Sequence, residues 1–450
     1  MMKSFLVGCG AGFSGDRTDA AAPVVKTLIE RGLPSAIIFE NLAERTLAAH
    51  QLTKRARPDL GFEPLLELEL EPILSDCLKH NIVIVGNFGA ANPRGAAKFI
   101  KALASKLKLN EPRIAVLEGD NLSDQDSKPL LKEQLGDSFD EENFVCANAY
   151  QGAREIAQAI KGGAQIVVTG RVADPSLTLG PAMAFFNWRE DNWDCLAGAS
   201  MAGHLLECGA QVTGGDFSDP GLKDVPNMEN IGFPIAQIFE DGSCIITKAD
   251  NSGGLVDVRT VKEQLLYELH DPSAYITPDV VCDITNATVE QVGHDQVRLS
   301  GVIGHPRTAS LKANVFFDGG WFGEGEISYA GPNAEARARL ACDILQKRMG
   351  KYMHLRFDLI GISSILGDDA GRMLSRHSAG QNLDVRVRVA AQHTSQQVID
   401  LLLREVTALW CGGPAGGGGV RVAKRQRLST QSCLIARDKL PASFHFYDDK

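Results

Sequence analysis

The chain has 450 residues, of which 44% are hydrophobic and 23% charged, and its formal net charge at pH 7 is −10. These values are typical of a globular protein with two or three domains, and the acidic balance argues against a nucleic-acid-binding protein, which needs a basic face. The sequence holds no apolar run of about 18 residues, so it predicts no membrane span.

The cysteines and the first residues bear on the compartment. The ten cysteines are scattered singly, without a C-x-x-C pair, so a zinc ribbon or a thioredoxin-like motif has no support. The N-terminus carries only Lys3 before a short apolar run that leads into a glycine-rich turn, which is typical of a first strand and not of an export signal. We therefore expect reduced thiols and a cytoplasmic protein.

Residues 1–225 alternate strand and helix patterns, which predicts an α/β domain with a Rossmann-like, mostly parallel sheet. The predicted strands are 5–7, 36–39, 82–85, 114–117, 144–147 and 166–168. The predicted helices are 19–31, 42–56, 64–80, 93–110 and 153–160. Between them, residues 121–142 form a polar, acidic stretch that we expect to be a surface excursion.

Residues 226–421 are rich in short alternating segments and turns, and predict an α+β domain. Helices are predicted over 258–269, 333–349 and 395–409, and strands over 355–361 and 383–391. The glycine-rich stretch 411–419 is either a flexible connector or a backbone-rich anion cradle. Residues 422–450 are expected to form a C-terminal tail.

Polar stretches that directly follow the predicted strands are the main functional signal. In open α/β sheets ligands bind beyond the carboxyl ends of the strands, so several polar exits along one chain predict one composite site. The first exit, residues 8–15, offers backbone N–H groups before a helix and suits a phosphate or carboxylate. It does not complete the G-x-G-x-x-G fingerprint, because Phe13 stands at the last position, and it lacks the lysine of a P-loop. A plain tight turn is the alternative.

Candidate residues for binding a substrate or an anion come from these exits. Arginine offers a bidentate fork for carboxylate or phosphate, and asparagine both donates and accepts hydrogen bonds. The alternatives are local: an ion pair for Arg17, a cap of the Pro93 helix for Asn92, and helix initiation for Asp174. The candidate set is Gly10, Gly12, Ser14, Asp16, Arg17, Asn87, Asn92, Arg94, Asn148, Arg171 and Asp174.

Four further residues are candidates for catalysis. Glu118 and Asp120 flank one glycine at a strand end, where carboxylates bind a metal or, once burial shifts their pKa, act as acid and base. His204 and Glu207 stand at i and i+3 of a predicted helix and share a face. They predict a proton-transfer pair or two metal ligands, with Cys208 as a candidate nucleophile. The alternative for His204 is a buried residue with a structural hydrogen bond.

Five stretches together resemble the acyclic terpene utilisation AtuA family. They are residues 8–17, 89–93, 169–175, 202–215 and 323–332, and the resemblance extends over about residues 4–421. It implies a setting in the degradation of acyclic terpenes or branched acids through CoA thioesters, and it supplies no settled reaction from which catalytic roles could be carried over. Many members carry a further small C-terminal domain, which leaves open a separately encoded partner of that type.

These observations favour a non-redox enzyme, a hydratase, dehydratase or lyase that acts on an acyl-CoA or a carboxylic acid. Arginines suit the anion, carboxylates and a histidine suit proton transfer, and nicotinamide and ATP signatures are weak. One alternative is a non-catalytic ligand-binding or assembly subunit of a catabolic complex. Another is a metal-dependent hydrolase built on Glu118, Asp120 and His204, with a divalent metal as cofactor. We expect a small-molecule substrate and a homo-oligomer, and neither nucleic acid nor membrane as a partner.

Overall fold

The structure is a computed structural model, and it describes residues 3–368, 372–376 and 382–448. The chain divides into two compact units. Unit 1 comprises Met1–Phe139, Val145–Val315 and Gln431–Lys450, and unit 2 comprises Asp140–Phe144 and Phe316–Thr430. The boundary expected near residue 225 therefore lies inside unit 1.

Unit 1 is built on a ten-stranded sheet with the order β11-β12-β8-β7-β1-β2-β3-β6-β4-β18. Five strands run parallel in its centre, and their apolar residues are buried. They are β1 (Ser4–Ala11), β2 (Ser35–Phe39), β3 (Val83–Gly86), β6 (Ile166–Val168) and β4 (Ile114–Glu118).

The remaining strands of this sheet pair antiparallel, so the prediction of a mostly parallel sheet was wrong. They are β7 (Pro234–Phe239), β8 (Cys244–Lys248), β11 (Thr288–Gly293), β12 (Gln296–Ser300) and β18 (Ser443–Phe446). Two hairpins add to the free edge of β1, and β18, from the expected tail, covers the edge of β4. Covering an edge removes unpaired backbone groups that would otherwise pair with another chain.

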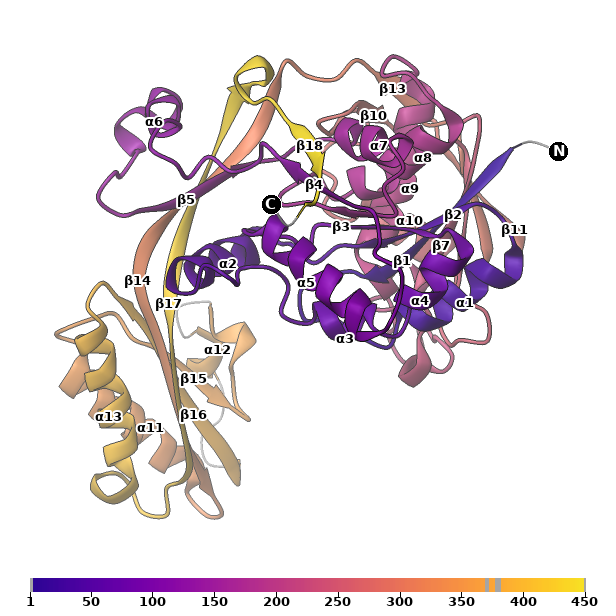
Figure 1. Ribbon diagram of the computed structural model, residues 1–450. Coiled ribbons are helices and arrows are strands. Elements are labelled where there is room, and N and C mark those ends of the chain that lie inside the picture. Colours follow the sequence, from indigo (N-terminus) through magenta and orange to yellow (C-terminus); the bar gives the residue numbers. More distant parts are fainter. Residues whose placement is uncertain (1–2, 369–371, 377–381, 449–450) are drawn as a thin grey trace. The chain divides into compact units, whose positions relative to one another are not determined.

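Helices lie on both faces of this sheet (Figure 1). One face carries α1 (Ala21–Arg31), α4 (Leu74–His80) and α5 (Pro93–Lys106), and the other carries α7 (Arg154–Lys161), α8 (Ser176–Phe186) and α9 (Trp193–Glu207). Crossovers between parallel strands are right-handed. The connections from β1 to β2, from β2 to β3 and from β3 to β4 all move in one direction across the sheet, so their helices lie on one face. The connection from β4 to β6 moves in the opposite direction, so α7 lies on the other face.

Several smaller elements complete unit 1. Helices α2 (Glu44–Ala56) and α10 (Val258–Leu266) agree with prediction, whereas the helix predicted over 64–80 is split into α3 (Leu66–Leu70) and α4, because Pro72 cannot continue a helix. Helix α6 (Lys128–Leu135) lies in the polar excursion. A small sheet consists of β9 (Tyr275–Ile276), β10 (Val281–Asp283) and β13 (Ile303–His305). Strand β5 (Phe144–Ala149) was predicted as a strand, but it pairs with β14 and stays outside the large sheet.

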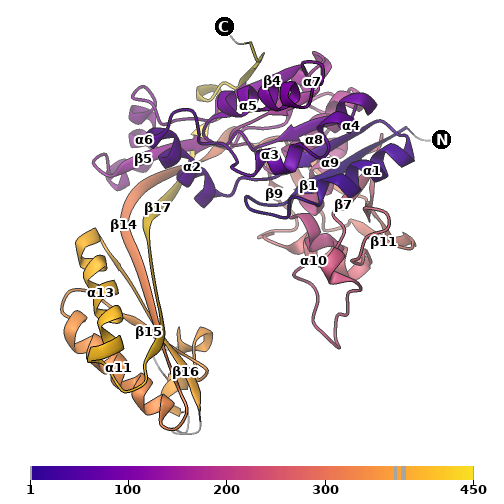
Figure 2. The same cartoon turned by 60° about the horizontal axis from the view of Figure 1, so that its bottom comes forward.

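Unit 2 is an α+β unit. Its elements are β14 (Ser310–Ala330), α11 (Ala334–Met349), β15 (Arg356–Ile360), the short α12 (Arg372–Arg376), β16 (Asp384–His393), α13 (Gln396–Gly412) and β17 (Gly418–Ala436). Apart from α12, this is the β-α-β-β-α-β order of the ferredoxin-like motif, and the strand order β15-β16-β14-β17 fits that motif. The first residues of β14 and the last residues of β17 belong to unit 1. Helices α11 and α13 pack side by side against the sheet (Figure 2). The glycine-rich stretch 411–419 joins α13 to β17.

The topology of unit 1 predicts where a ligand binds. Strands β3 and β6 are neighbours, and helix α5 leaves β3 on one face while α8 leaves β6 on the other. Such a switch point opens a crevice at the carboxyl ends of the strands. The exits of β1, β2, β3, β4 and β6 lie at this edge, because these strands are parallel neighbours in the sheet. The exit of β5 joins them through a β-bridge between Gln151 and Val172. Within the described part of the chain, no helix is long and apolar enough to cross a membrane.

Candidate functional site

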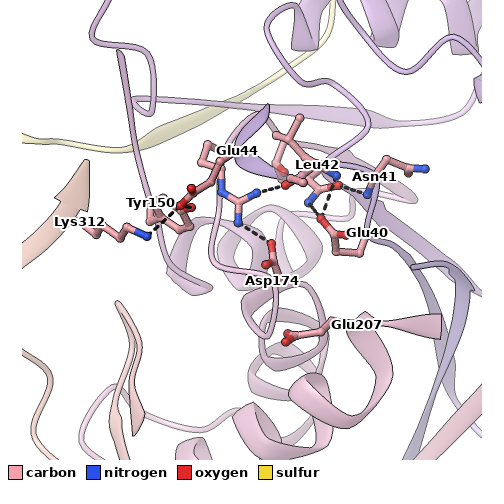
Figure 3. A network of polar contacts seen from close by, with 12 residues as sticks. Glu40, Asn41, Leu42, Glu44, Tyr150, Asp174, Glu207 and Lys312 are labelled. Atoms are coloured by element: carbon pink, nitrogen blue, oxygen red, sulfur yellow. Dashed lines mark hydrogen bonds and ion pairs between the residues drawn. The ribbon is translucent and has the colours of Figure 1, made fainter. Parts of the chain in front are cut away.

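Arg171, in the exit of β6, is the centre of a buried polar network, and its partners Leu42, Asp174 and Tyr150 are labelled in Figure 3. Its side chain is only 3% exposed. The guanidinium donates hydrogen bonds to the carbonyl of Leu42 and, at 2.7 Å, to Oδ1 of Asp174, and it stacks on the ring of Tyr150 at 4.2 Å. Burial lowers the pKa of Arg171, but the nearby acidic groups, Asp174 first, more than offset this and raise it. The guanidinium thus binds protein groups, and it holds the exits of β2, β5 and β6 together.

Glu44 ties a lysine and a tyrosine to the same network (Figure 3). Lys312 Nζ and the Tyr150 hydroxyl both donate to Glu44 Oε1 at 2.8 Å, and Asn314 Nδ2 donates to the tyrosine oxygen at 3.1 Å. Burial alone would raise the pKa of Glu44, but the hydrogen bonds from Lys312 and Tyr150 outweigh it and hold the pKa at about 2. Glu44 is therefore a charged anchor at neutral pH.

Next to this network lies a cavity of about 250 Å³, which we call the tyrosine cavity. Its walls are mainly apolar and include Tyr275, Ile276 and Leu311. Tyr150, Lys312 and Asp174 supply polar groups. Burial raises the pKa of Asp174, against the opposing charge and hydrogen bond of Arg171. The cavity therefore combines mainly apolar walls with a carboxyl of raised pKa and a lysine.

Glu40 and Glu69 are buried carboxyls beneath the exits. Glu40 Oε1 accepts hydrogen bonds from Asn87 Nδ2 at 2.9 Å and from the Leu42 N–H at 2.8 Å, and Glu69 Oε1 accepts from Asn41 Nδ2 at 2.8 Å. Burial raises the pKa of both carboxyls to about 8. Asp174 contributes to the shift of Glu40. At neutral pH the network therefore retains protons that exposed carboxyls would release.

His204 and Glu207 form the predicted pair on α9. His204 Nδ1 lies 2.9 Å from Glu207 Oε1, and the imidazole is 1% exposed. Burial lowers the pKa of His204, but Glu207 outweighs this and raises it, while burial raises the pKa of Glu207 to about 7. The imidazole packs on the ring of Tyr275, with 5.3 Å between centroids. His204 thus lies behind a wall of the tyrosine cavity and does not line it.

A second cavity of about 250 Å³, which we call the polar cavity, opens beside the start of α5. It is lined by five of the predicted site residues, namely Asn92, Arg94, Glu118, Asp120 and Asn148. Arg94 pairs with Glu118 at 3.0 Å. Asp120 Oδ2 accepts hydrogen bonds from Asn148 Nδ2 at 2.9 Å and from the Arg171 N–H at 2.8 Å. Burial raises the pKa of Asp120, although these hydrogen bonds oppose the shift. The predicted single site is thus divided between two cavities and the Arg171 network.

The exit of β1 is occupied by its own carboxylate. Asp16 accepts hydrogen bonds from the N–H groups of Gly12 at 2.9 Å and Arg17 at 2.7 Å. A Cβ on Gly10 would lie 2.6 Å from the Phe39 ring, and one on Gly12 would lie 2.5 Å from the nitrogen of Gly209, so close packing explains both glycines. Arg17 pairs with Asp19 and Ser14 bonds Glu63. The loop amides suit an anion, as expected, and here they bind Asp16.

Two of the asparagines have structural partners. Asn92 caps α5, as expected, since its side chain accepts from the Gly95 N–H at 3.2 Å. Asn87 is fully buried and joins the exits of β2 and β3, because it donates to Glu40 and accepts from the Asn41 N–H at 2.6 Å.

Five residues of the network and its cavity were not among the predicted site residues, namely Glu40, Glu44, Tyr150, Tyr275 and Lys312. Glu40 and Glu44 directly follow the buried strand β2, so the strand-exit pattern itself could have found them. That exit contains no glycine, whereas glycines mark the other strand exits, so it was not recognised as one of them. Lys312 and Tyr275 had no local signal, because they reach the cavity from strands far along the chain.

Two larger hollows lie elsewhere. One of about 560 Å³ is lined by residues 361–366 and Arg376 of unit 2, and one of about 530 Å³ is lined by residues around Trp188. Neither is lined by a residue of the predicted site. Among the residues that the structure describes, no group of three or more His, Cys, Asp or Glu side chains is arranged to hold a metal ion. His204 in particular lies apart from the carboxylates of the polar cavity.

Unit 1 has the architecture of α/β proteins that bind small molecules. In such proteins the ligand binds at a switch point of the sheet, beside polar strand exits and in a cavity with mainly apolar walls. The model of the family described as "Acyclic terpene utilisation family protein AtuA" matches residues 5–446. The chain therefore belongs to the AtuA family, whose description names a role in acyclic terpene utilisation. Neither the curated proteins nor the solved structures gave a match.

Proposed function

We propose that this protein is a non-redox enzyme of acyclic terpene degradation that acts on a branched acyl group bound in the tyrosine cavity. The substrate is an acyl-CoA or the free acid, and the reaction is a hydration, a dehydration or a related lyase step. The observation that carries the proposal is the Asp174 carboxyl in the wall of a cavity whose other walls are mainly apolar.

The cavity suits an acyl chain better than a whole cofactor. Its volume of about 250 Å³ is below the roughly 300–1,000 Å³ of sites that enclose drug-sized ligands. An apolar chain gains roughly 25 cal/mol for each Å² of apolar surface that it buries there. The nucleotide of a CoA ester would remain outside the cavity. The Lys312 ammonium, with 47% of its side chain exposed, suits the carbonyl or anionic end.

Asp174 is our candidate for proton transfer. Hydration and dehydration both need a group that gives a proton at one stage and takes it at the other. Burial raises the pKa of Asp174 above that of an exposed carboxyl, which is the direction that a general acid requires. Since Arg171 binds Oδ1, we assign the transfer to Oδ2. Arg171 orients the carboxyl and stabilises its charged form, so its role is positioning and not anion binding.

The His204–Glu207 pair is proposed to store a proton behind the cavity wall. The charge of Asp174 contributes to the raised pKa of Glu207, so the two carboxyls influence each other electrostatically. A proton held by the pair neutralises the charge of Glu207. The ionised form of Asp174, which accepts a proton from the substrate, then costs less free energy. His204 does not line the cavity, so we assign it a positioning role.

The experiment is a panel of branched acyl-CoA esters and free acids, with turnover followed by mass spectrometry. Asp174→Asn should lower turnover roughly 10²–10⁴-fold, the usual contribution of general acid–base catalysis, and should leave ligand-induced stabilisation in place. Asp126→Asn, at an exposed position of the acidic excursion, is the matched control and should behave as wild type. Unchanged turnover in Asp174→Asn would reject the assignment. Binding without turnover of any compound would favour a ligand-binding subunit.

A further inference from the structure

The polar cavity is not used by the proposed reaction, yet its lining has the features of a ligand site. Arg171 lies between the two cavities: its backbone N–H bonds Asp120 of the polar cavity, and its guanidinium bonds Asp174 of the tyrosine cavity. The polar cavity is therefore a second site at the same edge of the sheet. It is lined by other residues than the tyrosine cavity, so a ligand can bind there whether or not the proposed reaction is correct.

Two buried side chains of the polar cavity hold polar atoms without protein partners. Gln51 is 6% exposed and Asn148 is 1% exposed, and both line the cavity. Gln51 Nε2 and Asn148 Oδ1 have no hydrogen-bond partner among the described residues. The orientation of Asn148 is set by its Nδ2, which donates to Asp120. Two residues of the lining thus each hold one buried polar atom without a protein partner in the described part of the chain, a donor on Gln51 and an acceptor on Asn148, and each such atom is costly to bury unpaired.

Positive charge gathers on the donor side. Lys54 Nζ donates to the Ala91 carbonyl at 2.7 Å, and an ammonium carries three donors, so two remain for a ligand. The first residues of α5, Pro93 and Arg94, also line the cavity, and a helix N-terminus favours an anion. Arg94 is paired with Glu118, and both side chains are about half exposed. The lining therefore includes a cation, an amide donor and an amide acceptor, together with the Asp120 carboxyl, whose Oδ2 is bonded to Asn148 and to the Arg171 N–H.

We propose that the polar cavity binds a small oxyanion that also carries a hydroxyl group. The anionic oxygens would accept from Lys54 and Gln51, and the hydroxyl would donate to Asn148 Oδ1. A hydroxycarboxylate and a hydrogen phosphate group share this chemistry. A ligand of either kind satisfies both unpartnered atoms at once, which a simple carboxylate or a neutral alcohol does not.

The test is isothermal titration of the full chain with glycolate, inorganic phosphate, acetate and glycerol at low ionic strength. Glycolate or phosphate should bind. Acetate, which lacks the hydroxyl, should bind about tenfold more weakly than glycolate, because it leaves Asn148 Oδ1 without a donor; a factor of ten corresponds to about 1.4 kcal/mol. Glycerol, which lacks the charge, should not bind. Binding of phosphate alone would identify a phosphate group as the ligand, and binding of glycolate alone would identify a hydroxycarboxylate.

Three variants locate the site. Lys54→Met and Gln51→Leu should each weaken binding of the anion about tenfold or more. Lys98→Met, at an exposed position of α5, is the matched control and should bind as wild type. Gln51→Leu should fold normally, because an unpaired amide is replaced by an apolar group of similar size. Asp174→Asn should leave binding of the anion unchanged, so failure here is distinguishable from failure of the proposed reaction. The proposal is overturned if neither anion binds, or if both variants bind as wild type.

Discussion

Replacement of Arg171 by methionine tests the network on which the site depends. The variant keeps most of the apolar stem and removes the hydrogen bonds to Leu42 and Asp174 and the stacking on Tyr150. Breaking a buried ion pair by removing one partner costs about 3–5 kcal/mol. Asp174 has a side chain that is 32% exposed, so it can take up a proton or contact water, and we expect the lower end, about 3 kcal/mol.

Thermal unfolding at pH 7 measures this loss. The entropy of unfolding is about 2.1 cal/mol/K per residue, so in a unit of the size of unit 1, roughly 330 residues, a loss of 1 kcal/mol shifts Tm by about 1.4 °C. Arg171→Met should therefore lower Tm by about 4 °C. Arg171→Met/Asp174→Asn should recover part of the loss, since no unpaired charge remains, with a coupling of about 0.5–3 kcal/mol. Arg17→Met breaks an exposed pair with Asp19 and should cost about 1 kcal/mol or less. The reasoning fails if Arg171→Met costs no more than Arg17→Met.

Two further predictions concern the buried protons. His204→Gln should lower the free energy of unfolding by about 1–3 kcal/mol, because Glu207 loses its partner. It should also lower turnover per folded molecule by up to about 10²-fold, with KM unchanged. Unchanged turnover at reduced stability would leave His204 a purely structural role. Glu40 has a pKa of about 8 in the folded chain and about 4.3 when unfolded, so the native state keeps a proton that the unfolded state releases, and stability falls as pH rises between these values. Glu40→Gln keeps the acceptor oxygen and removes this titration, so its Tm relative to wild type should rise from pH 5 to pH 8, and parallel Tm curves would contradict the shift.

Local signals predicted the elements of unit 1 better than their arrangement. Apolar runs placed the central strands, because buried parallel strands are continuous in hydrophobicity. The same runs do not say which strands pair, so the addition of β7 and β8 to the edge of β1, and of β18 to the edge of β4, was not foreseen. The chain also enters unit 2 and returns to unit 1, and this long-range return has no local signal.

The candidate site shows the same limit at the level of side chains. The exits supplied polar groups at one edge of the sheet, as the strand pattern predicts. Whether such a group faces a ligand or a protein partner depends on neighbours that sequence spacing does not give. Asp16 binds the amides of its own loop, and Arg171 binds Asp174, whereas Asp120 and Asn148 line a cavity.

The central claim is that a branched acyl group binds in the tyrosine cavity, and the most direct test is ligand-induced stabilisation of a variant in which that cavity is filled. Ile276 lines the cavity and is 61% exposed, so Ile276→Trp fills the space without disturbing the core. Ile303→Trp, at a 40% exposed position of the same small sheet, is the control. A branched acyl-CoA at 100 times its Kd should stabilise wild type and Ile303→Trp by about 2.7 kcal/mol and should not stabilise Ile276→Trp. Equal stabilisation of all three proteins would contradict the assignment of the acyl group to this cavity.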